Sequence, residues 1–197
     1  MKKLTPALWL PLGLFLLGAP ACSRQSDDPL PASAREAKPG KGGGAGATAK
    51  SALTLPKLGA APVWQLKDVN GELVSFEQFK GKVVVVDFWA TWCPPCRAEI
   101  PGYIDLVRKH AKEGLVIVGI SLDQAGPEVV KVFAAKTGIN YPLVMGDESV
   151  VSAFGGVEGI PTTFLIDRSG QIRDRKVGAE ETAEYEKKLL AVLREQT

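Results

Sequence analysis

The run VVVVDFWATWCPPC, residues 83–96, contains the signals that decide the fold of this chain. It opens with an almost continuous apolar stretch, which is typical of a central strand that is covered on both faces. An aromatic turn then leads to Cys93 and Cys96. The two prolines between these cysteines suit the first turn of a helix, where a backbone N–H is not required. A helix is therefore predicted from the prolines to about Lys112, with a dithiol at its start.

A dithiol in this position favours thiol–disulfide exchange. Unpaired backbone N–H groups and the positive end of the helix dipole stabilise a thiolate at Cys93. Cys96, one turn further along, can then attack a mixed disulfide formed at Cys93 and release the partner protein in its reduced form. A purely structural disulfide is the weaker interpretation of the pair.

Metal binding by the two cysteines is weaker still. A zinc site usually needs four ligands, and His110, the single histidine of the chain, lies about four helical turns beyond Cys96. We expect His110 to be a surface residue near the end of the helix, where a partial positive charge is favourable. No metal and no other cofactor is expected.

The first 21 residues have the pattern of a secretory signal peptide. Two lysines precede an apolar stretch from Leu8 to Leu17, which is too short to span a bilayer and is followed by small residues. Cleavage after Ala21 leaves Cys22 first, and this site resembles the lipobox of bacterial lipoproteins, whose cysteine carries lipid. Ordinary cleavage would give the same end without lipid. Lipidation of Cys22 would account for the odd cysteine.

Composition divides the rest of the chain. Residues 22–60 are rich in Ala, Gly, Lys, Pro and Ser, so they are predicted to form a lipid-anchored flexible linker. Residues 61–197 suffice for one compact domain. The 24 basic and 22 acidic residues give no sign of nucleic-acid binding. We expect an exported protein of the bacterial cell envelope, whose lipid at Cys22 leaves the domain facing the periplasm or the outer membrane surface.

Strand and helix patterns alternate along the predicted domain. Asn70-Gly71 indicates a tight turn, and hence an N-terminal hairpin formed by residues 63–66 and 72–75. The other predicted elements are strands at 83–88, 115–121, 141–145, 160–167 and 171–177, and helices at 127–136, 148–154 and 180–194. This order indicates an α/β domain with a central mixed sheet.

These residues resemble a known family. Trp92-Cys93-Pro94-Pro95-Cys96 resembles the active site of the thioredoxin superfamily, and Gly159-Ile160-Pro161-Thr162 resembles its cis-proline loop. More narrowly, residues 88–101 look like those of the exported TlpA/ResA-type thiol-disulfide reductases, relatives of the cytochrome c maturation thioredoxins. From about residue 60 onward, the resemblance implies a thioredoxin-like three-layer sandwich. It includes the N-terminal hairpin and an added strand and helix between Gly114 and Tyr141.

The resemblance also implies two functional acids. Glu99, on the next turn after Cys96, would exchange a proton with that cysteine. Asp87 resembles the buried aspartate of thioredoxins, and a buried carboxyl with a raised pKa can deprotonate Cys96 through water. Each acid has a plainer interpretation: Glu99 as a solvated helix residue, and Asp87 as a polar edge residue if the strand turns it outward. The sequence leaves open which acid serves Cys96.

Other residues near the cysteines are expected to bind the substrate. Trp92 would present an apolar face beside the site, whereas Phe88 and Trp89 are assigned to the core. The resemblance implies a cis bond between Ile160 and Pro161, with exposed backbone beside the first cysteine that an extended client segment could pair with. A plain turn proline is the alternative.

Pro94 and Pro95, which are also assigned to substrate binding, bear on the direction of the reaction. Neither side chain supplies a charge or a hydrogen-bond donor. A thiolate without such extra stabilisation favours a reducing protein over an oxidising one.

The leading hypothesis is a membrane-tethered thiol-disulfide oxidoreductase that reduces disulfides in exported client proteins. By resemblance, the clients are apocytochrome c or copper-site proteins. A membrane electron donor of the thiol-transfer type is also expected, since exported compartments lack a cytosolic thiol pool. One alternative is a peroxiredoxin-like peroxidase, although Thr91 lies one position closer to Cys93 than that pattern requires. The other is a non-catalytic module that binds apoproteins or copper through the dithiol.

Overall fold

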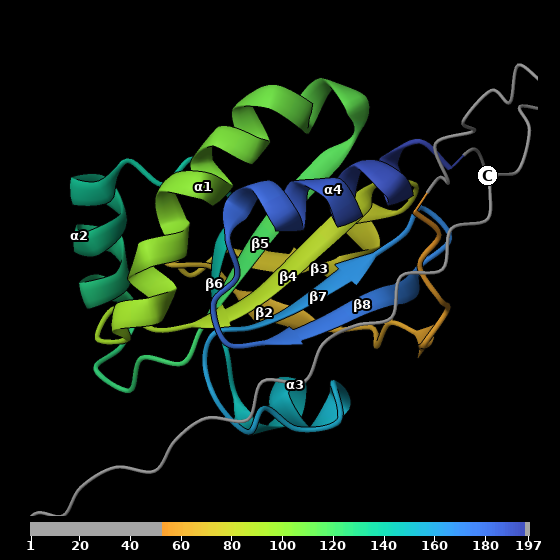
Figure 1. Ribbon diagram of the computed structural model, residues 1–197. Coiled ribbons are helices and arrows are strands. Elements are labelled where there is room, and N and C mark those ends of the chain that lie inside the picture. Colours follow the sequence, from red (N-terminus) through yellow and green to blue (C-terminus); the bar gives the residue numbers. More distant parts are fainter. Residues whose placement is uncertain (1–52, 196–197) are drawn as a thin grey trace, which may run out of the picture. The chain divides into compact units, whose positions relative to one another are not determined.

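The computed structural model describes residues 53–195, so the predicted signal peptide, Cys22 and most of the predicted linker lie outside the described residues. Six strands form one sheet in the order β1-β8-β7-β4-β5-β6, and β2 and β3 form a separate hairpin (Figure 1). The strands are β1 (Gly59–Ala60), β2 (Gln65–Lys67), β3 (Leu73–Ser75), β4 (Val83–Trp89), β5 (Leu115–Ser121), β6 (Leu143–Met145), β7 (Thr162–Ile166) and β8 (Gln171–Val177). The helices are α1 (Pro94–His110), α2 (Pro127–Thr137), α3 (Glu148–Ala153) and α4 (Thr182–Leu193).

Strand β4 lies at the centre of a mixed sheet. It pairs in parallel with β5 and antiparallel with β7, and all seven of its residues are buried. The continuous apolar run of the sequence predicts this position, because a strand covered on both faces has no reason to alternate apolar and polar residues. The end of β4 therefore delivers the aromatic turn and the cysteines from a rigid support.

Two cores, one on each face of the sheet, make the domain a three-layer sandwich. Val83 and Val85 of β4 belong to the core that α1, α2 and α4 share, while Val84 and Val86 pack against α3 and the β2–β3 hairpin. Figure 1 shows α1 and α4 on one side of the sheet and α3 on the other. The predicted fold is confirmed, including the hairpin and the added strand and helix, which are β5 and α2.

Two elements were not predicted. A short 3₁₀ helix spans Phe76–Phe79, and β1 pairs with the start of β8 inside a range that the composition assigns to the linker. Buried Arg173 helps to hold that segment, since its guanidinium donates to the carbonyl oxygens of Leu55 and Pro56 at 2.6 and 3.0 Å. A composition typical of a linker does not reveal such contacts, because they depend on the distant strand β8.

The expectation that His110 is a surface residue is wrong. The residue is only 8% exposed, and its ring nitrogens lie 2.9 Å from carboxylate oxygens of Glu113 and Glu186. Burial lowers the pKa of His110, but the two hydrogen-bonded carboxylates outweigh that effect and raise it above its ordinary value. The cause is tertiary: α4 packs beside α1 and brings Glu186 to the histidine.

Within residues 53–195, no helix has both the length and the apolar character that crossing a membrane requires.

Candidate active site

Cys93 and Cys96 form a disulfide at the first turn of α1. Cys93 is the N-cap residue of the helix, and its sulfur accepts a hydrogen bond from the backbone N–H of Cys96 at 3.2 Å. Both cysteines are nearly buried, whereas Trp92 before them is 65% exposed and the two prolines between them are exposed. The predicted cysteine pair at a helix start is confirmed, and exposed apolar side chains flank it.

The proline loop lies beside the first cysteine. The bond between Ile160 and Pro161 is cis, as the resemblance implies, and the carbonyl oxygen of Ile160 lies 3.7 Å from the sulfur of Cys93. Hydrogen bonds hold the loop: Gly178 N–H donates to the carbonyl of Pro161 at 2.8 Å, and the Thr162 hydroxyl donates to Gly159 at 2.6 Å. The sequence places this loop 67 residues from Cys93, and the pairing of β4 with β7 brings them together.

Asp87 is a buried acid in the middle of the sheet. It is 4% exposed, and the Thr163 hydroxyl of β7 donates to its carboxylate at 3.1 Å. Burial, aided by the negative charge of Glu99, raises the pKa of Asp87 to about 7, although Lys176 and the Thr163 hydrogen bond oppose the shift. The interpretation of Asp87 as an outward edge residue is therefore wrong, and the predicted buried carboxyl is confirmed.

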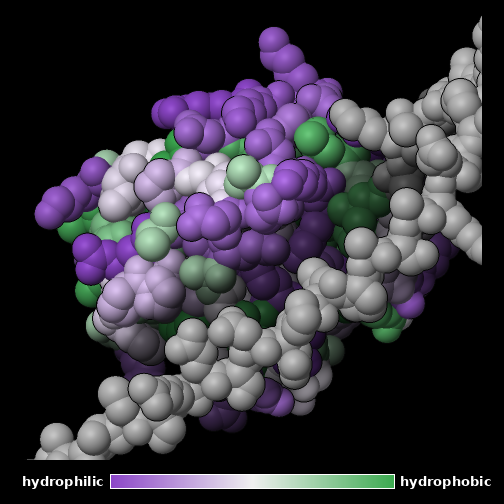
Figure 2. Space-filling model, in the orientation of Figure 1, coloured by the Kyte–Doolittle hydropathy of each residue, from purple (hydrophilic) through white to green (hydrophobic). Residues whose placement is uncertain are grey.

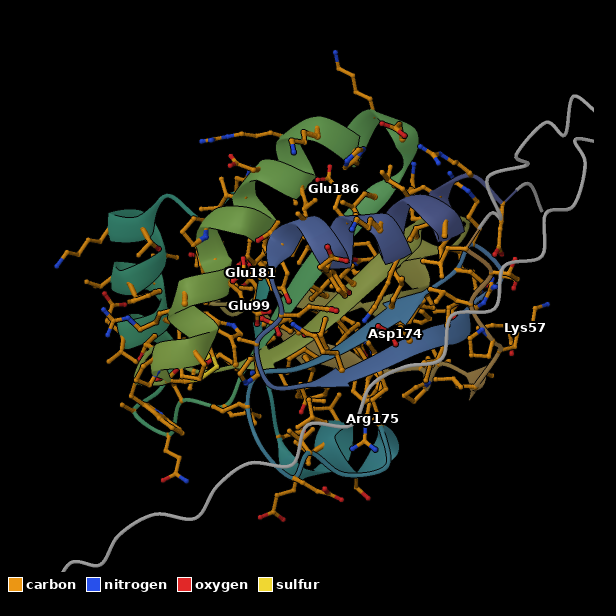
Figure 3. The ribbon with its side chains drawn as sticks, in the orientation of Figure 1. Lys57, Glu99, Asp174, Arg175, Glu181 and Glu186 are labelled. Atoms are coloured by element: carbon orange, nitrogen blue, oxygen red, sulfur yellow. A yellow bond between two sulfur atoms is a disulfide. The ribbon has the colours of Figure 1, made fainter. Side chains whose placement is uncertain are left out.

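Glu99 is buried as well, so its interpretation as a solvated helix residue is wrong. It is 6% exposed, forms an ion pair with Lys176, and accepts the backbone N–H of Glu180 at 3.0 Å. Its second oxygen, Oε2, has no hydrogen-bond partner among the described residues. Figure 3 shows Glu99 on α1, close to Glu181 where the chain enters α4. A buried carboxylate with one unsatisfied oxygen is costly, and such groups are found where function needs them.

Lys176 and Tyr103 were missed by the sequence analysis. The ammonium group of Lys176 lies 3.4 Å from the Tyr103 hydroxyl, which in turn lies 3.3 Å from the hydroxyl of Thr163. Together with the contacts above, a continuous polar chain links Asp87 to Glu99 through the protein interior. No local signal marks Lys176, because its partner lies 77 residues away on another element.

Asp123, also missed, fixes the turn that precedes Cys93. Its carboxylate accepts the backbone N–H and the hydroxyl of Thr91 at 2.9 and 2.6 Å, and the hydroxyl of Ser121 at 2.8 Å. The Thr91 hydroxyl thus donates to Asp123. A peroxidase would need an activating threonine at the reactive cysteine, so this geometry disfavours that alternative.

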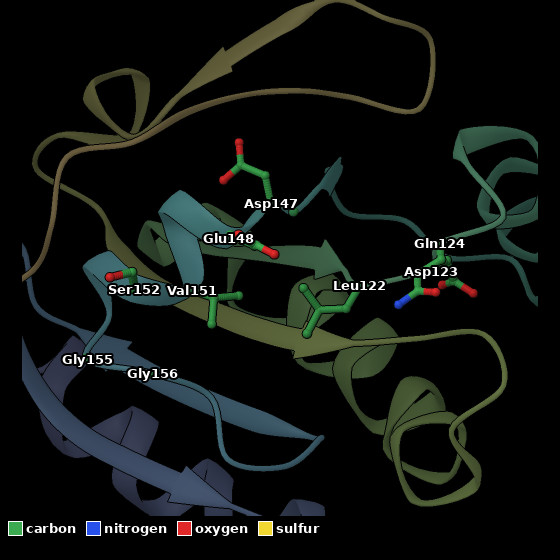
Figure 4. Close-up of a pocket in the computed structure, with 10 residues that line it drawn as sticks. Leu122, Asp123, Gln124, Asp147, Glu148, Val151, Ser152, Gly155 and Gly156 are labelled. Atoms are coloured by element: carbon green, nitrogen blue, oxygen red, sulfur yellow. The ribbon is translucent and has the colours of Figure 1, made fainter.

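A separate hollow of about 680 Å³ lies past the ends of β5 and β6 (Figure 4). Three acidic residues line it: Asp123, Asp147 and Glu148. The carboxylate of Asp123 already accepts the hydroxyl of Thr91, and the carboxylate of Asp147 caps α3 by accepting the N–H of Val150. Across the part of the chain that the structure describes, no group of three or more His, Cys, Asp or Glu side chains is placed to hold a metal ion.

Comparisons with known proteins indicate the family of the chain. The model of the AhpC/TSA family matches residues 59–175. The thioredoxin-like protein YneN of Bacillus subtilis (strain 168) is 36% identical over 130 residues, which cover 66% of this chain and 76% of that protein. The thiol-disulfide oxidoreductase ResA of Bacillus anthracis is 32% identical over 124 residues, covering 63% and 70% respectively.

Solved structures give the same result. A putative thiol:disulfide interchange protein DsbE from Chlorobium tepidum aligns with a TM-score of 0.65 and 31% identity over 71% of this chain and 99% of its own. A thioredoxin family thiol:disulfide interchange protein from Chlorobium tepidum TLS aligns with a TM-score of 0.64 and 36% identity, over 68% and 96%. The chain therefore belongs to the AhpC/TSA family, has the thioredoxin fold, and is a thiol-disulfide oxidoreductase of the ResA/DsbE type.

Proposed function

We propose that this oxidoreductase works as a reductase of disulfides in exported client proteins, held at a membrane by lipid on Cys22. Oxidoreductases of this family act on disulfide-containing clients. The finer assignment, to apocytochrome c or copper-site proteins as clients and to a membrane thiol-transfer donor, rests on the signal-peptide pattern and on the resemblance around Cys93.

The surroundings of Cys93 carry the proposal of a reducing direction. Among residues 53–195, its sulfur accepts a hydrogen bond only from the N–H of Cys96 and lies 3.7 Å from the carbonyl oxygen of Ile160, and neither group is a charged side chain. Pro94 and Pro95 add no donor. A thiolate that is stabilised only by the helix start is a better reductant than one that also has a cationic partner, since stabilising the reduced form makes a protein more oxidising.

The proposed reaction consumes the dithiol and regenerates the disulfide. The thiolate of Cys93 attacks one sulfur of the client disulfide, that bond breaks, and the other client sulfur leaves as a thiolate. Deprotonated Cys96 then attacks the sulfur of Cys93 and releases the second client thiolate. Two electrons pass to the client, and the protein ends with the Cys93–Cys96 disulfide that the structure contains. A thiol donor at the membrane would reduce it again.

Within this reaction, Asp87 is the proposed acceptor of the proton from Cys96, through water. Its pKa of about 7 leaves the base form well populated near neutral pH, which suits a general base. Glu99 acts beside it, since its negative charge is one of the causes of that raised pKa. The ion pair of Glu99 with Lys176 fixes the position of this charge. Trp92 and the Ile160–Pro161 loop form the surface that receives the client.

Trapping the mixed disulfide tests the central step. In Cys96→Ser, the thiolate of Cys93 can still attack, but nothing resolves the product, so a covalent adduct with a disulfide-bonded protein such as insulin should accumulate. It should run as a larger species on a non-reducing gel and disappear with dithiothreitol. In Cys93→Ser, neither adduct nor turnover is expected. Turnover that persists in Cys93→Ser would contradict the mechanism.

A separate experiment tests the tether. Cells that express the full chain would be fed radiolabelled palmitate, with Cys22→Ser as the matched variant. Label is expected in the unsubstituted protein, which should sediment with membranes, and label should be absent from the variant. An unlabelled mature protein that fractionates as soluble would remove the lipid anchor and leave the reductase proposal intact.

A further inference from the structure

A groove between α1 and α2 continues the surface around the cysteines. Two adjoining hollows of about 550 and 500 Å³ share Arg97, Phe133 and Thr137 as lining residues. One hollow reaches Pro94 and the other reaches Thr91, on the two sides of Cys93 in the sequence. Figure 1 shows α2 beside the first turns of α1. The groove therefore begins at the turn that carries the attacking cysteine.

Helix α2 leaves apolar side chains uncovered along this groove. A surface helix normally buries its apolar stripe, but in α2 only Val130 is buried. Val129 and Val132 are 38% and 60% exposed, and both line the groove with half-buried Phe133. Figure 2 shows hydrophobic surface near the left edge of the view, where Figure 1 draws α2.

Positive charge accompanies these apolar side chains. The guanidinium of Arg97 lies 5.8 Å from the centre of the Phe133 ring, and Lys136 is exposed at the end of α2. Neither cation forms an ion pair with a carboxylate of the described domain. Glu128 is the one acid among the lining residues. The groove thus offers two unpaired cations against one anion, which complements an acidic partner.

We propose that this groove binds the stretch of client chain next to the client's reactive disulfide, in extended form, through an apolar and an acidic side chain. The proposal rests on the proposed reductase function, because it takes the client to be the polypeptide that becomes covalently bound at Cys93. That bond brings the neighbouring client residues to the mouth of the groove. The preferred clients carry an apolar residue that packs on Val132 and Phe133, and a carboxylate that meets Arg97 or Lys136.

Helix geometry sets where those side chains lie in the client. Arg97 is four residues from Cys93, which is a rise of about 6 Å along α1. An extended chain covers about 3.3 Å per residue. The acidic residue that meets Arg97 is therefore expected about two residues from the client cysteine, with the apolar residue next to it.

Chromogenic peptides test the proposal without a known client. Short serine-rich peptides with one cysteine, held as a mixed disulfide with 5-thio-2-nitrobenzoate, would be mixed with the fully reduced protein. The series places leucine and aspartate on one flank of the cysteine, on the other flank, or on neither, and one peptide has lysine instead of aspartate. Released yellow thiolate gives kcat/KM. The free symmetrical disulfide of the same chromophore, which is too small to reach the groove, reports on Cys93 alone.

The expected result is a preference that depends on the groove. Leucine with aspartate on one flank should raise kcat/KM about threefold to tenfold over the serine peptide. The peptide with lysine instead of aspartate should lose part of this gain. Val132→Ser and Lys136→Glu should remove this preference but leave the rate with the small disulfide unchanged. The control is Leu73→Ser, which changes an equally exposed apolar residue on β3. This variant should keep the preference for leucine and aspartate.

Two possible outcomes separate a failure of the groove proposal from a failure of the proposed reductase function. Equal rates for all peptides, or a preference that Val132→Ser and Lys136→Glu leave intact, would overturn the groove while the reductase function stands. Failure of the reduced, folded protein to release the chromophore even from the small disulfide would overturn both. Circular dichroism of each variant, all at exposed positions, verifies that the fold is retained.

Discussion

Lys176 of β8 and Glu99 of α1 form a buried ion pair, and both charges act on the carboxyl of Asp87. The side chains of Lys176 and Glu99 are only 9% and 6% exposed. The arrangement places a fixed pair of opposite charges next to a titrating acid. Removing either charge should therefore change both the stability of the domain and the protonation of Asp87.

Lys176→Met should destabilise the protein by about 3–5 kcal/mol, because it leaves the charge of Glu99 buried without its partner. The double variant Lys176→Met/Glu99→Gln should recover much of that loss, since no uncompensated charge then remains. Urea unfolding of both variants measures the difference. Lys188→Met is a control, because that lysine is more exposed and loses only partly solvated ion pairs. Equal losses in the single and double variants would argue against the pair as a coupled unit.

Asp87→Asn should stabilise the protein at neutral pH. The pKa of Asp87 is raised from 3.8 to about 7 in the folded state, so between these values the folded protein holds a proton that the unfolded chain has lost. Because the unfolded chain releases this proton and the folded protein does not, the free energy of unfolding falls progressively as pH rises from about 4 to about 7. The advantage of Asp87→Asn should grow over this range and level off above it. Urea unfolding of the oxidised proteins at several pH values measures it; an advantage independent of pH would show that Asp87 does not titrate there.

The same substitution should slow the step that uses Cys96. In the unsubstituted protein, the rate at which the mixed disulfide is resolved should rise with pH through an inflection near 7, where Asp87 becomes a base. In Asp87→Asn, that inflection should vanish and the rate at pH 7 should fall about a hundredfold. Stopped-flow single turnovers with the symmetrical chromophore disulfide separate the two steps, because the first attack and the resolution each release one yellow thiolate. The rate of the first attack should change less. An unchanged pH profile would remove Asp87 from proton transfer.

Peroxide should be a poor substrate. The Thr91 hydroxyl donates to Asp123 at 2.6 Å, so it is not available to activate a peroxide at Cys93. The reduced protein should consume hydrogen peroxide no faster than an ordinary dithiol such as dithiothreitol at the same pH. Thr91→Val should not change that rate. Consumption well above this background would favour the peroxidase alternative.

Elements with strong local signals were predictable from the sequence. The apolar run of β4, the cysteines at a helix start and the turn at Asn70-Gly71 each determine local structure, and their positions agree with the prediction within a few residues. β1 was missed because two residues in a linker-like composition give no pattern. Its pairing with β8 is a tertiary effect.

Of the polar groups around the site, some could be predicted from the sequence and others could not. Position in the strand and helix, together with the family resemblance, nominated Asp87 and Glu99. Lys176 and Asp123 were not, because they contribute through partners that are 77 and 32 residues away. His110 was misplaced for the same reason: its environment depends on α4 packing against α1.

The reduction potential of the Cys93–Cys96 pair tests the central claim most directly. The protein is equilibrated at pH 7 with thioredoxin of known potential, and the mixture is quenched with acid. The amounts of the oxidised and reduced forms then give the reduction potential of the pair. A reductase with uncharged prolines between its cysteines should lie near thioredoxin, at about −270 mV. A value near that of strongly oxidising thiol proteins, about −120 mV, would contradict the reductive role and make the protein a donor of disulfides.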